Sequence, residues 1–112
     1  MTRCVADKWY ESDGDLAIYL SALGHANYAE AGKDIVCAAV SSLCTAFANT
    51  LLEYGVPKIS IRLKEGNFLV DAFITENKQQ CEGAYDMVVN GLQMLAEQYP
   101  DHVFFAKSGW SH

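Results

Sequence analysis

Hydrophobic and polar residues alternate in several short runs of this chain, and this alternation predicts strands. Residues 3–11 form a weakly alternating run. SDGD is a turn signal, and the following DLAIYLSAL places Leu16, Ile18 and Leu20 on one face of a second strand. The segment before Gly24 is therefore expected to form two consecutive strands.

Three further strands are predicted in the second half of the chain. KISIRLK alternates cleanly, and Ile59, Ile61 and Leu63 are expected to point inward. EGN then turns the chain into NFLVDAFI, so that these two runs form a hairpin. HVFFA is a short apolar run between Pro100 and Gly109, which is typical of a buried final strand.

Two segments have the helical period. The first begins after Asp34, and Gly55 and Pro57 mark its end. The second is expected to begin after Asn77, which would form a capping box with Gln80. The apolar stripes of the two helices consist of Val36, Val40, Leu43, Phe47 and Leu51, and of Cys81, Ala84, Tyr85, Val88, Leu92, Leu95 and Tyr99.

The resulting element order is ββαββαβ. It predicts a single α+β domain over residues 1–112, in which two helices pack against a mixed sheet of about five strands. A chain of 112 residues is long enough to bury a core without disulfides or metals.

Composition and charge narrow the classes of function. The chain has 14 acidic and 8 basic residues, a net charge of −6. This balance disfavours direct nucleic-acid binding, which depends on Lys and Arg, and it suits a basic protein partner. The N-terminus is too polar for a signal peptide, and the longest apolar run, from Ile35, is expected to be too short to span a membrane. We therefore expect a cytoplasmic protein that does not bind a membrane.

Four cysteines, at positions 4, 37, 44 and 81, provide the candidate chemistry. No CxxC pair and no His/Cys spacing of a zinc site occurs, so neither a metal nor another cofactor is expected. Cys37 and Cys44 would lie about 10 Å apart along one helix face, too far for a disulfide. Cys4, Cys44 and Cys81 are interpreted as packing residues.

Cys37 differs from the other cysteines in its position. With Asp34 as the N-cap, Cys37 lies in the first helical turn, where free amides and the positive end of the macrodipole stabilise a thiolate by about 0.3–1 kcal/mol. Because this alone does not ionise a thiol at neutral pH, a nearby imidazolium must supply the rest, and His25 is the candidate. The first-turn amides are also candidate donors to an oxyanion. His102 and His112 are interpreted as surface histidines.

Asp34 has two candidate roles. It can cap the helix, or it can orient His25 as the third member of a triad. The cap is the preferred interpretation, because the position three residues before Cys37 already requires one. Glu30 is a weaker candidate for orienting His25.

The segment GHANYAEAGKDIVCAAVS, residues 24–41, resembles the signature of the ribosomal-processing cysteine protease family (Prp). The resemblance implies a catalytic histidine at His25, a nucleophile at Cys37 and a homodimer. It also implies a mobile loop over the active site, here residues 26–33, hinged by Gly24 and Gly32.

The activity implied by the resemblance is that of an endopeptidase. Such proteins remove a short N-terminal extension from the large-subunit ribosomal protein L27 during ribosome assembly, and the basic character of this substrate fits the charge of −6. Residues 104–107, FFAK, resemble the cleaved segment of such substrates, although a final strand is the preferred interpretation.

Two alternatives from other classes remain open at this point. The chain could be a non-catalytic domain that docks on an assembling ribosomal particle, with Cys37 as an inert core residue, since free cysteine is often buried. It could also be a redox-sensing thiol protein, because an exposed cysteine that ionises readily is also readily oxidised.

Overall fold

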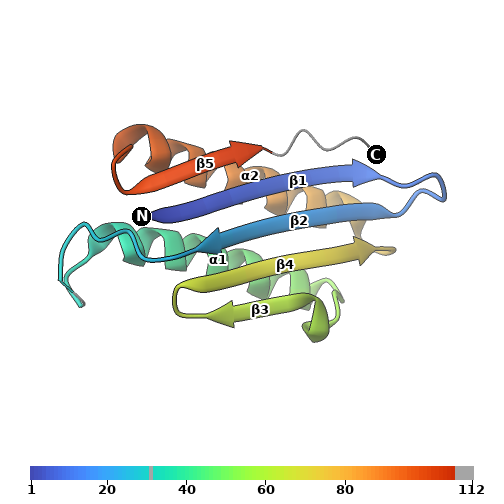
Figure 1. Ribbon diagram of the computed structural model, residues 1–112. Helices are drawn as coiled ribbons and strands as arrows, with labels where there is room; N and C mark the ends of the chain where they lie inside the picture. The colour runs from blue at the N-terminus through green and yellow to red at the C-terminus, as the bar shows by residue number, and fades with distance from the viewer. Residues whose placement is uncertain (31, 108–112) are drawn as a thin grey trace.

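The computed structural model describes residues 1–30 and 32–107, and it confirms the predicted element order (Figure 1). The helices are α1 (Ile35–Glu53) and α2 (Lys78–Gln98), and a 3₁₀ turn, η1, covers Lys58–Ser60. The strands are β1 (Thr2–Tyr10), β2 (Leu16–Leu23), β3 (Ile61–Lys64), β4 (Asn67–Ile74) and β5 (Val103–Lys107).

The strands form one mixed sheet in the order β3-β4-β2-β1-β5. β5 runs parallel to β1, and the other neighbouring pairs are antiparallel. Strands that run in the same direction need a long crossover connection, and α2 provides it between β4 and β5. Both helices lie on the same side of the sheet, and its other face is open (Figure 1). The α+β prediction is confirmed.

The core lies between the sheet and the two helices. Leu16, Ile18 and Leu20 of β2 are at most 1% exposed, as their predicted shared face requires. The two helices approach closely at Gly91, where a Cβ atom would lie 2.9 Å from Cδ1 of Leu43. The buried residues of the helices are Val36, Val40, Cys44, Phe47, Ala48 and Leu51 on α1, and Cys81, Tyr85, Val88, Val89 and Leu92 on α2.

The strand predicted from Lys58 begins later than expected. Residues 58–60 form the 3₁₀ turn, in which the Ser60 amide donates to the Pro57 carbonyl at 3.0 Å, and Ile59 is 95% exposed. Leu63 does lie opposite the buried Phe68, so it faces the helix side of the sheet. Because β3 is an edge strand, Leu63 nevertheless stays 46% exposed. The inward direction predicted for Ile59 is wrong, whereas Leu63 points inward as predicted but is not buried.

The capping box predicted for α2 is also wrong. Asn77 does precede the helix, but its backbone is left-handed, with φ 55°, and its side chain makes no capping bond. Its Nδ2 instead donates to the carbonyl oxygen of Tyr54, the C-cap residue of α1, at 3.1 Å. Asn77 therefore joins the two helices, because the end of α1 offers an unpaired carbonyl.

The length and hydropathy of α1 also differ from the expectation. The helix has 19 residues with a mean hydropathy of 1.8, so by length and composition it is long enough to cross a membrane. The expectation that the apolar run from Ile35 is too short is therefore wrong. In this structure the apolar stripe of α1 packs in the core, and core helices share that composition.

The C-terminal run is a strand as far as Lys107. Its residues 103–107 pair with residues 2–6 of β1, so the FFAK segment is held in the sheet. Residues 108–112, which include His112, lie outside the described residues.

The burial of α1 predicts different costs for two adjacent leucines, of which Leu51 is 0% and Leu52 38% exposed. Leu51→Ala should lower the free energy of unfolding by about 2–5 kcal/mol, because it leaves a cavity in the core. Leu52→Ala should cost about 1 kcal/mol or less, because its side chain already contacts water. Urea denaturation measures both losses, and equal values would contradict the assigned helix face.

Candidate active site

Asp34 caps α1. Its Oδ1 accepts hydrogen bonds from the backbone N–H groups of Val36, at 3.0 Å, and Cys37, at 2.9 Å. These two amides belong to the first turn and have no partner within the helix. The bond from the Cys37 amide is the main cause that holds the pKa of the Asp34 carboxyl below its ordinary value. The structure thus shows the capping role that the sequence favours.

The other carboxylate oxygen of Asp34 holds the loop that precedes the helix. Its Oδ2 accepts from the backbone amides of Tyr28, at 2.9 Å, and Ala29, at 3.4 Å. Both oxygens therefore accept backbone N–H groups, and no hydrogen bond joins Asp34 to His25 among the described residues. The arrangement favours a cap over an orienting role.

Cys37 is partly buried, and its sulfur faces the same loop. The backbone N–H of Ala26 donates to Cys37 Sγ at 3.1 Å. Ala26 is 1% exposed, so this bond is shielded from water. An amide that donates to sulfur stabilises its thiolate, in addition to the effect of the helix N-terminus. The residue that donates to the sulfur, Ala26, directly follows His25 in the chain.

His25 lies against the turn between β3 and β4. Its side chain is exposed, and a Cβ atom on Gly66 would lie only 2.8 Å from Nε2 of the ring. The Gly24 amide donates to the Gly66 carbonyl at 2.9 Å, which fixes the start of the loop to that turn. No hydrogen bond or ion pair joins His25 to Cys37 in the described part of the chain, so their dyad stays a prediction.

A cleft of about 730 Å³ contains both residues. One wall is α1, where Cys37, Ser41 and Thr45 follow one another at four-residue spacing. The opposite wall includes Leu63 and Phe68 of the β3–β4 hairpin. A cleft of this volume is typical of ligand sites, for which about 300–1,000 Å³ is usual. An extended peptide lying in this cleft would have access to the Cys37 sulfur.

The other three cysteines are buried and chemically inert. Desolvation raises the pKa of Cys4 to about 12 and that of Cys44 to about 12, and it also raises the pKa of Cys81. Such thiols stay protonated at neutral pH, and the thiolate is the nucleophile. Their interpretation as packing residues is confirmed, and Cys37 is the one cysteine that is not fully buried.

The two glycines that bound the loop differ in their surroundings. Both have positive φ, 90° at Gly24 and 85° at Gly32. A Cβ atom on Gly24 would lie 2.7 Å from the Met1 carbonyl oxygen, whereas Gly32 has open space around it. Gly24 is therefore required by close backbone packing. A hinge function for either glycine stays a prediction.

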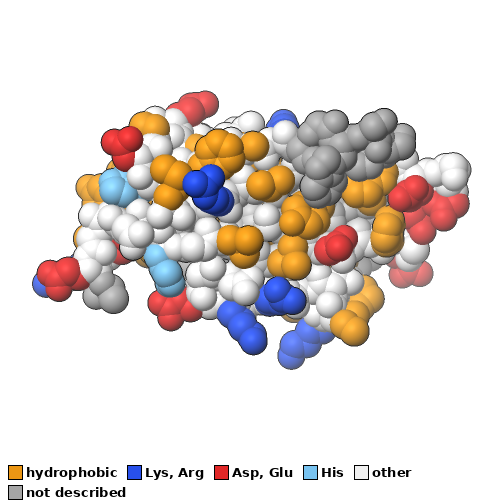
Figure 2. All heavy atoms as spheres, in the orientation of Figure 1, with side chains coloured by type: hydrophobic (Ala, Val, Ile, Leu, Met, Phe, Trp, Pro, Cys, Tyr) orange, Lys and Arg blue, Asp and Glu red, His pale blue; other side chains and the backbone are white. Residues whose placement is uncertain are grey.

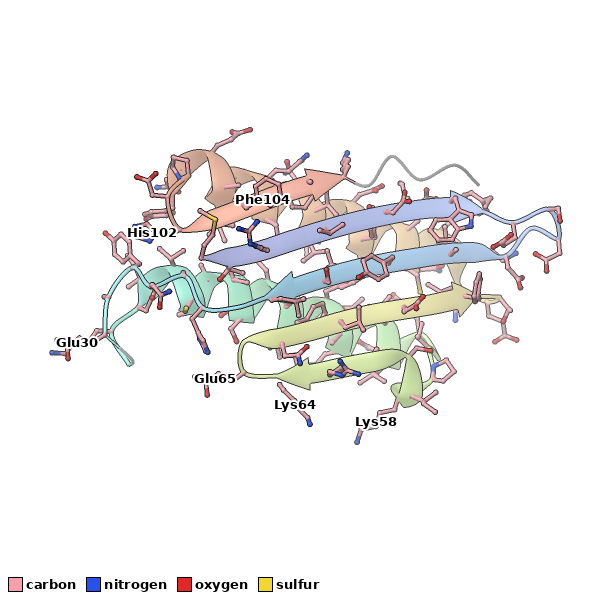
Figure 3. The ribbon with its side chains drawn as sticks, in the orientation of Figure 1. Glu30, Lys58, Lys64, Glu65, His102 and Phe104 are labelled. Atoms are coloured by element: carbon pink, nitrogen blue, oxygen red, sulfur yellow. The ribbon has the colours of Figure 1, made fainter. Side chains whose placement is uncertain are left out.

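The outer part of the loop is held by His102, which the sequence did not associate with the site, and by ring contacts of Tyr28, a residue of the loop itself. His102 Nδ1 lies 2.9 Å from the Ala26 carbonyl oxygen. Tyr28 packs edge-to-face on the rings of His102 and Tyr99, with centroid distances of 5.3 and 5.4 Å. Figure 3 shows His102 at the end of the molecule where this loop lies. The interpretation of His102 as a simple surface residue is wrong, because it is partly buried and bonded to the loop.

Three residues of the site were not singled out from the sequence, for two different reasons. His102 and Gly66 contact the loop from segments far along the chain, and Ala26 has no reactive side chain. The EGN turn signal marks Gly66 and the motif of residues 24–41 includes Ala26, but no local pattern marks His102.

Comparisons with known proteins identify the family of this chain. The family model described as cysteine protease Prp matches residues 8–104. The ribosomal processing cysteine protease Prp of Mycoplasma genitalium is 36% identical over 91 residues, which cover 76% of this chain and 83% of that protein. The crystal structure of the ribosomal processing protease Prp from S. aureus with a covalently linked product peptide is similar in fold. Its TM-score is 0.76 at 19% identity, and the alignment covers 96% of this chain and 100% of that one. SMU.848 from Streptococcus mutans has a TM-score of 0.64 at 25% identity, with 96% of each chain covered.

The cleft contains a partly exposed cysteine at a helix N-terminus, as a thiol nucleophile requires. Together with these relatives, it identifies the protein as a cysteine protease. The chain belongs to the cysteine protease Prp family, as the motif of residues 24–41 indicated. This membership disfavours the non-catalytic alternative.

The lowered pKa of Asp34 predicts an acid-dependent contribution to stability. The cap stabilises the fold above the unfolded-state pKa of about 3.9, and this stabilisation is lost as the pH falls through the lower folded-state pKa. Asp34→Asn keeps a capping oxygen that does not titrate, so the variant should lack this component, whereas Asp34→Ala should lower Tm at neutral pH. Thermal unfolding between about pH 2 and 7 measures this difference, and an Asn variant with the wild-type acid profile would contradict it.

Proposed function

We propose that this protease removes the N-terminal extension of the L27 precursor in the cytoplasm during ribosome assembly, with His25 and Cys37 as its catalytic dyad. The observation that carries the proposal is the Ala26 amide bonded to the Cys37 sulfur in a cleft that also contains His25. The Prp proteins of M. genitalium and S. aureus are both called ribosomal processing proteases. A net charge of −6 suits a basic ribosomal substrate.

The proposed reaction is acyl transfer to the thiol. His25 takes the proton of Cys37, and the thiolate attacks the scissile carbonyl carbon to form a tetrahedral intermediate. The C–N bond then breaks as the His25 imidazolium protonates the leaving amine, which leaves a thioester. Water attacks the thioester, His25 accepts its proton, and Cys37 is released with the product carboxylate.

We propose a donor to the oxyanion other than the first-turn amides that the sequence suggests. The Val36 and Cys37 amides already donate to Asp34, and the Ala38 amide donates to the Asp34 carbonyl at 3.1 Å. The Ala26 N–H is the amide that the fold places at the sulfur, and therefore near the carbonyl that sulfur attacks. In the proposed mechanism this amide stabilises the thiolate first and the oxyanion next.

His25 must come within hydrogen-bonding distance of Cys37 for this reaction. Its ring is exposed and makes no hydrogen bond to the described residues, so rotation of the side chain meets little resistance. Active-site hydrogen bonds of this kind often tighten only when substrate is bound. We infer that a peptide in the cleft turns the imidazole from Gly66 toward the sulfur.

Substitution of either dyad residue should abolish cleavage. Cys37→Ala and His25→Ala are each expected to lower kcat/KM by about 10³-fold or more with an unchanged circular dichroism spectrum, because each removes a group that reacts directly. Cys81→Ala, on α2 and outside the cleft, is the matched control and should remain active. The measurement is intact-mass analysis of the L27 precursor after incubation. A folded Cys37→Ala variant that still cleaves would refute the dyad, and an uncleaved precursor with active wild type would refute the substrate.

We also propose a homodimer, and the open face of the sheet supports it. This face carries Leu23, Phe73 and Phe104, which are 46, 59 and 44% exposed. Figure 2 shows hydrophobic side chains spread across it. Apolar area of this kind on a sheet is a common site of association.

A charge on this face should weaken the dimer. Phe73→Glu is expected to raise the dissociation constant by about tenfold or more, because it buries an unpaired carboxylate at the interface. Met87→Glu on α2, at a side chain 64% exposed, is the control and should not change it. Sedimentation velocity measures both. A wild type that stays monomeric at all concentrations would exclude the proposal.

A further inference from the structure

The Ala26 residue is held by hydrogen bonds on both sides. Its N–H donates to Cys37 Sγ at 3.1 Å, and its carbonyl oxygen lies 2.9 Å from His102 Nδ1. These two groups flank a single Cα atom, and the Ala26 side chain is 1% exposed. A shift of the carbonyl therefore changes the direction of the N–H, because φ and ψ of one residue connect them.

His102 is itself rigidly placed. Its backbone N–H donates to the Tyr99 carbonyl at 2.9 Å, and its own carbonyl accepts from the Thr2 amide at 2.9 Å. The turn between α2 and β5 is thus tied to the end of the helix and to the start of β1. A side chain on such a base can position a partner accurately. Tyr28 adds a second contact, edge-to-face on the imidazole at 5.3 Å.

We propose that His102 is a positioning residue, which holds the Ala26 amide against the Cys37 sulfur and so sets the reactivity of the thiol. The inference rests on the proposed function, in which Cys37 is the nucleophile. His102 lies at the opposite end of the chain from the catalytic motif, and it does not line the cleft that contains Cys37. It acts on the sulfur only through the backbone of Ala26.

The chemistry of the bond restricts the tautomer of His102. A carbonyl oxygen only accepts, so Nδ1 must carry the hydrogen and donate. The neutral Nδ1–H tautomer and the imidazolium both satisfy this condition. The positioning function therefore requires a donor at Nδ1 but does not require a positive charge, and an uncharged substitute can test this.

Two substitutions that are nearly isosteric with each other distinguish the effect of the N–H donor from the effect of side-chain shape. His102→Asn places an N–H donor the same number of bonds from the backbone as Nδ1, and His102→Leu places a methyl group there. Both variants lose the ring that contacts Tyr28, so this loss cancels in the comparison. Because thiol alkylation needs no substrate, a failure of this inference can be distinguished from a failure of the proposed protease reaction.

The experiment measures the rate of Cys37 alkylation by iodoacetamide against pH, together with exchange of the Ala26 amide hydrogen. We expect His102→Leu to slow alkylation at neutral pH by about tenfold, the effect of one lost hydrogen bond, and to accelerate the exchange. His102→Asn should restore both to within about twofold of wild type. Equal rates in the Leu and Asn variants would overturn the inference, since a purely structural role predicts that result. If His102→Leu does not fold, the wild type and His102→Asn decide: fast exchange of Ala26 in the wild type, or tenfold slower alkylation in the Asn variant, overturns it.

Discussion

One carboxylate determines the geometry of the candidate active site. A helix N-terminus leaves backbone amides without partners, and a loop that folds back on that helix leaves others. Asp34 satisfies both sets, because one oxygen accepts from Val36 and Cys37 and the other from Tyr28 and Ala29. Because its two oxygens bind different segments, Asp34 fixes the loop to the first turn of α1. The position of Ala26 beside the Cys37 sulfur depends on that junction.

The cleft exists where it does because of strand register. β2 pairs with β4 so that Leu23 lies opposite Asn67, which brings the end of β2 beside the β3–β4 turn. The Gly24 amide then reaches the Gly66 carbonyl, and the loop leaves the sheet between that turn and α1. His25 and Cys37 consequently face one space from different walls. A register shift of one residue would move the end of β2 away from that turn and would invert the faces of the β2 side chains.

Differences in burial give the four cysteines different thiol reactivity. Cys4 and Cys44 lie in the core, where desolvation keeps the thiol protonated with a pKa of about 12. Cys37 lies only two turns from Cys44 on the same helix, yet it is only partly buried and receives an amide hydrogen bond. The distinct environment of Cys37 therefore requires no unusual residue type. It requires a cysteine at the N-terminal end of a helix that is partly open on the side of the cleft.

The order of the elements, the cap at Asp34 and the first-turn position of Cys37 follow from the sequence alone. Each depends on a period or on residues within one helical turn, so a local pattern contains the information. The exposure of Ile59, the bond from Asn77 to Tyr54 and the contact of His102 with Ala26 do not follow from it. Those features depend on which distant segments become neighbours; His102 and Ala26, for example, are 76 positions apart. Only the folded sheet, which places β5 beside β1, brings that histidine to the loop. The partner of a polar side chain is decided by such long-range packing, because its own sequence neighbours do not specify what will lie across from it.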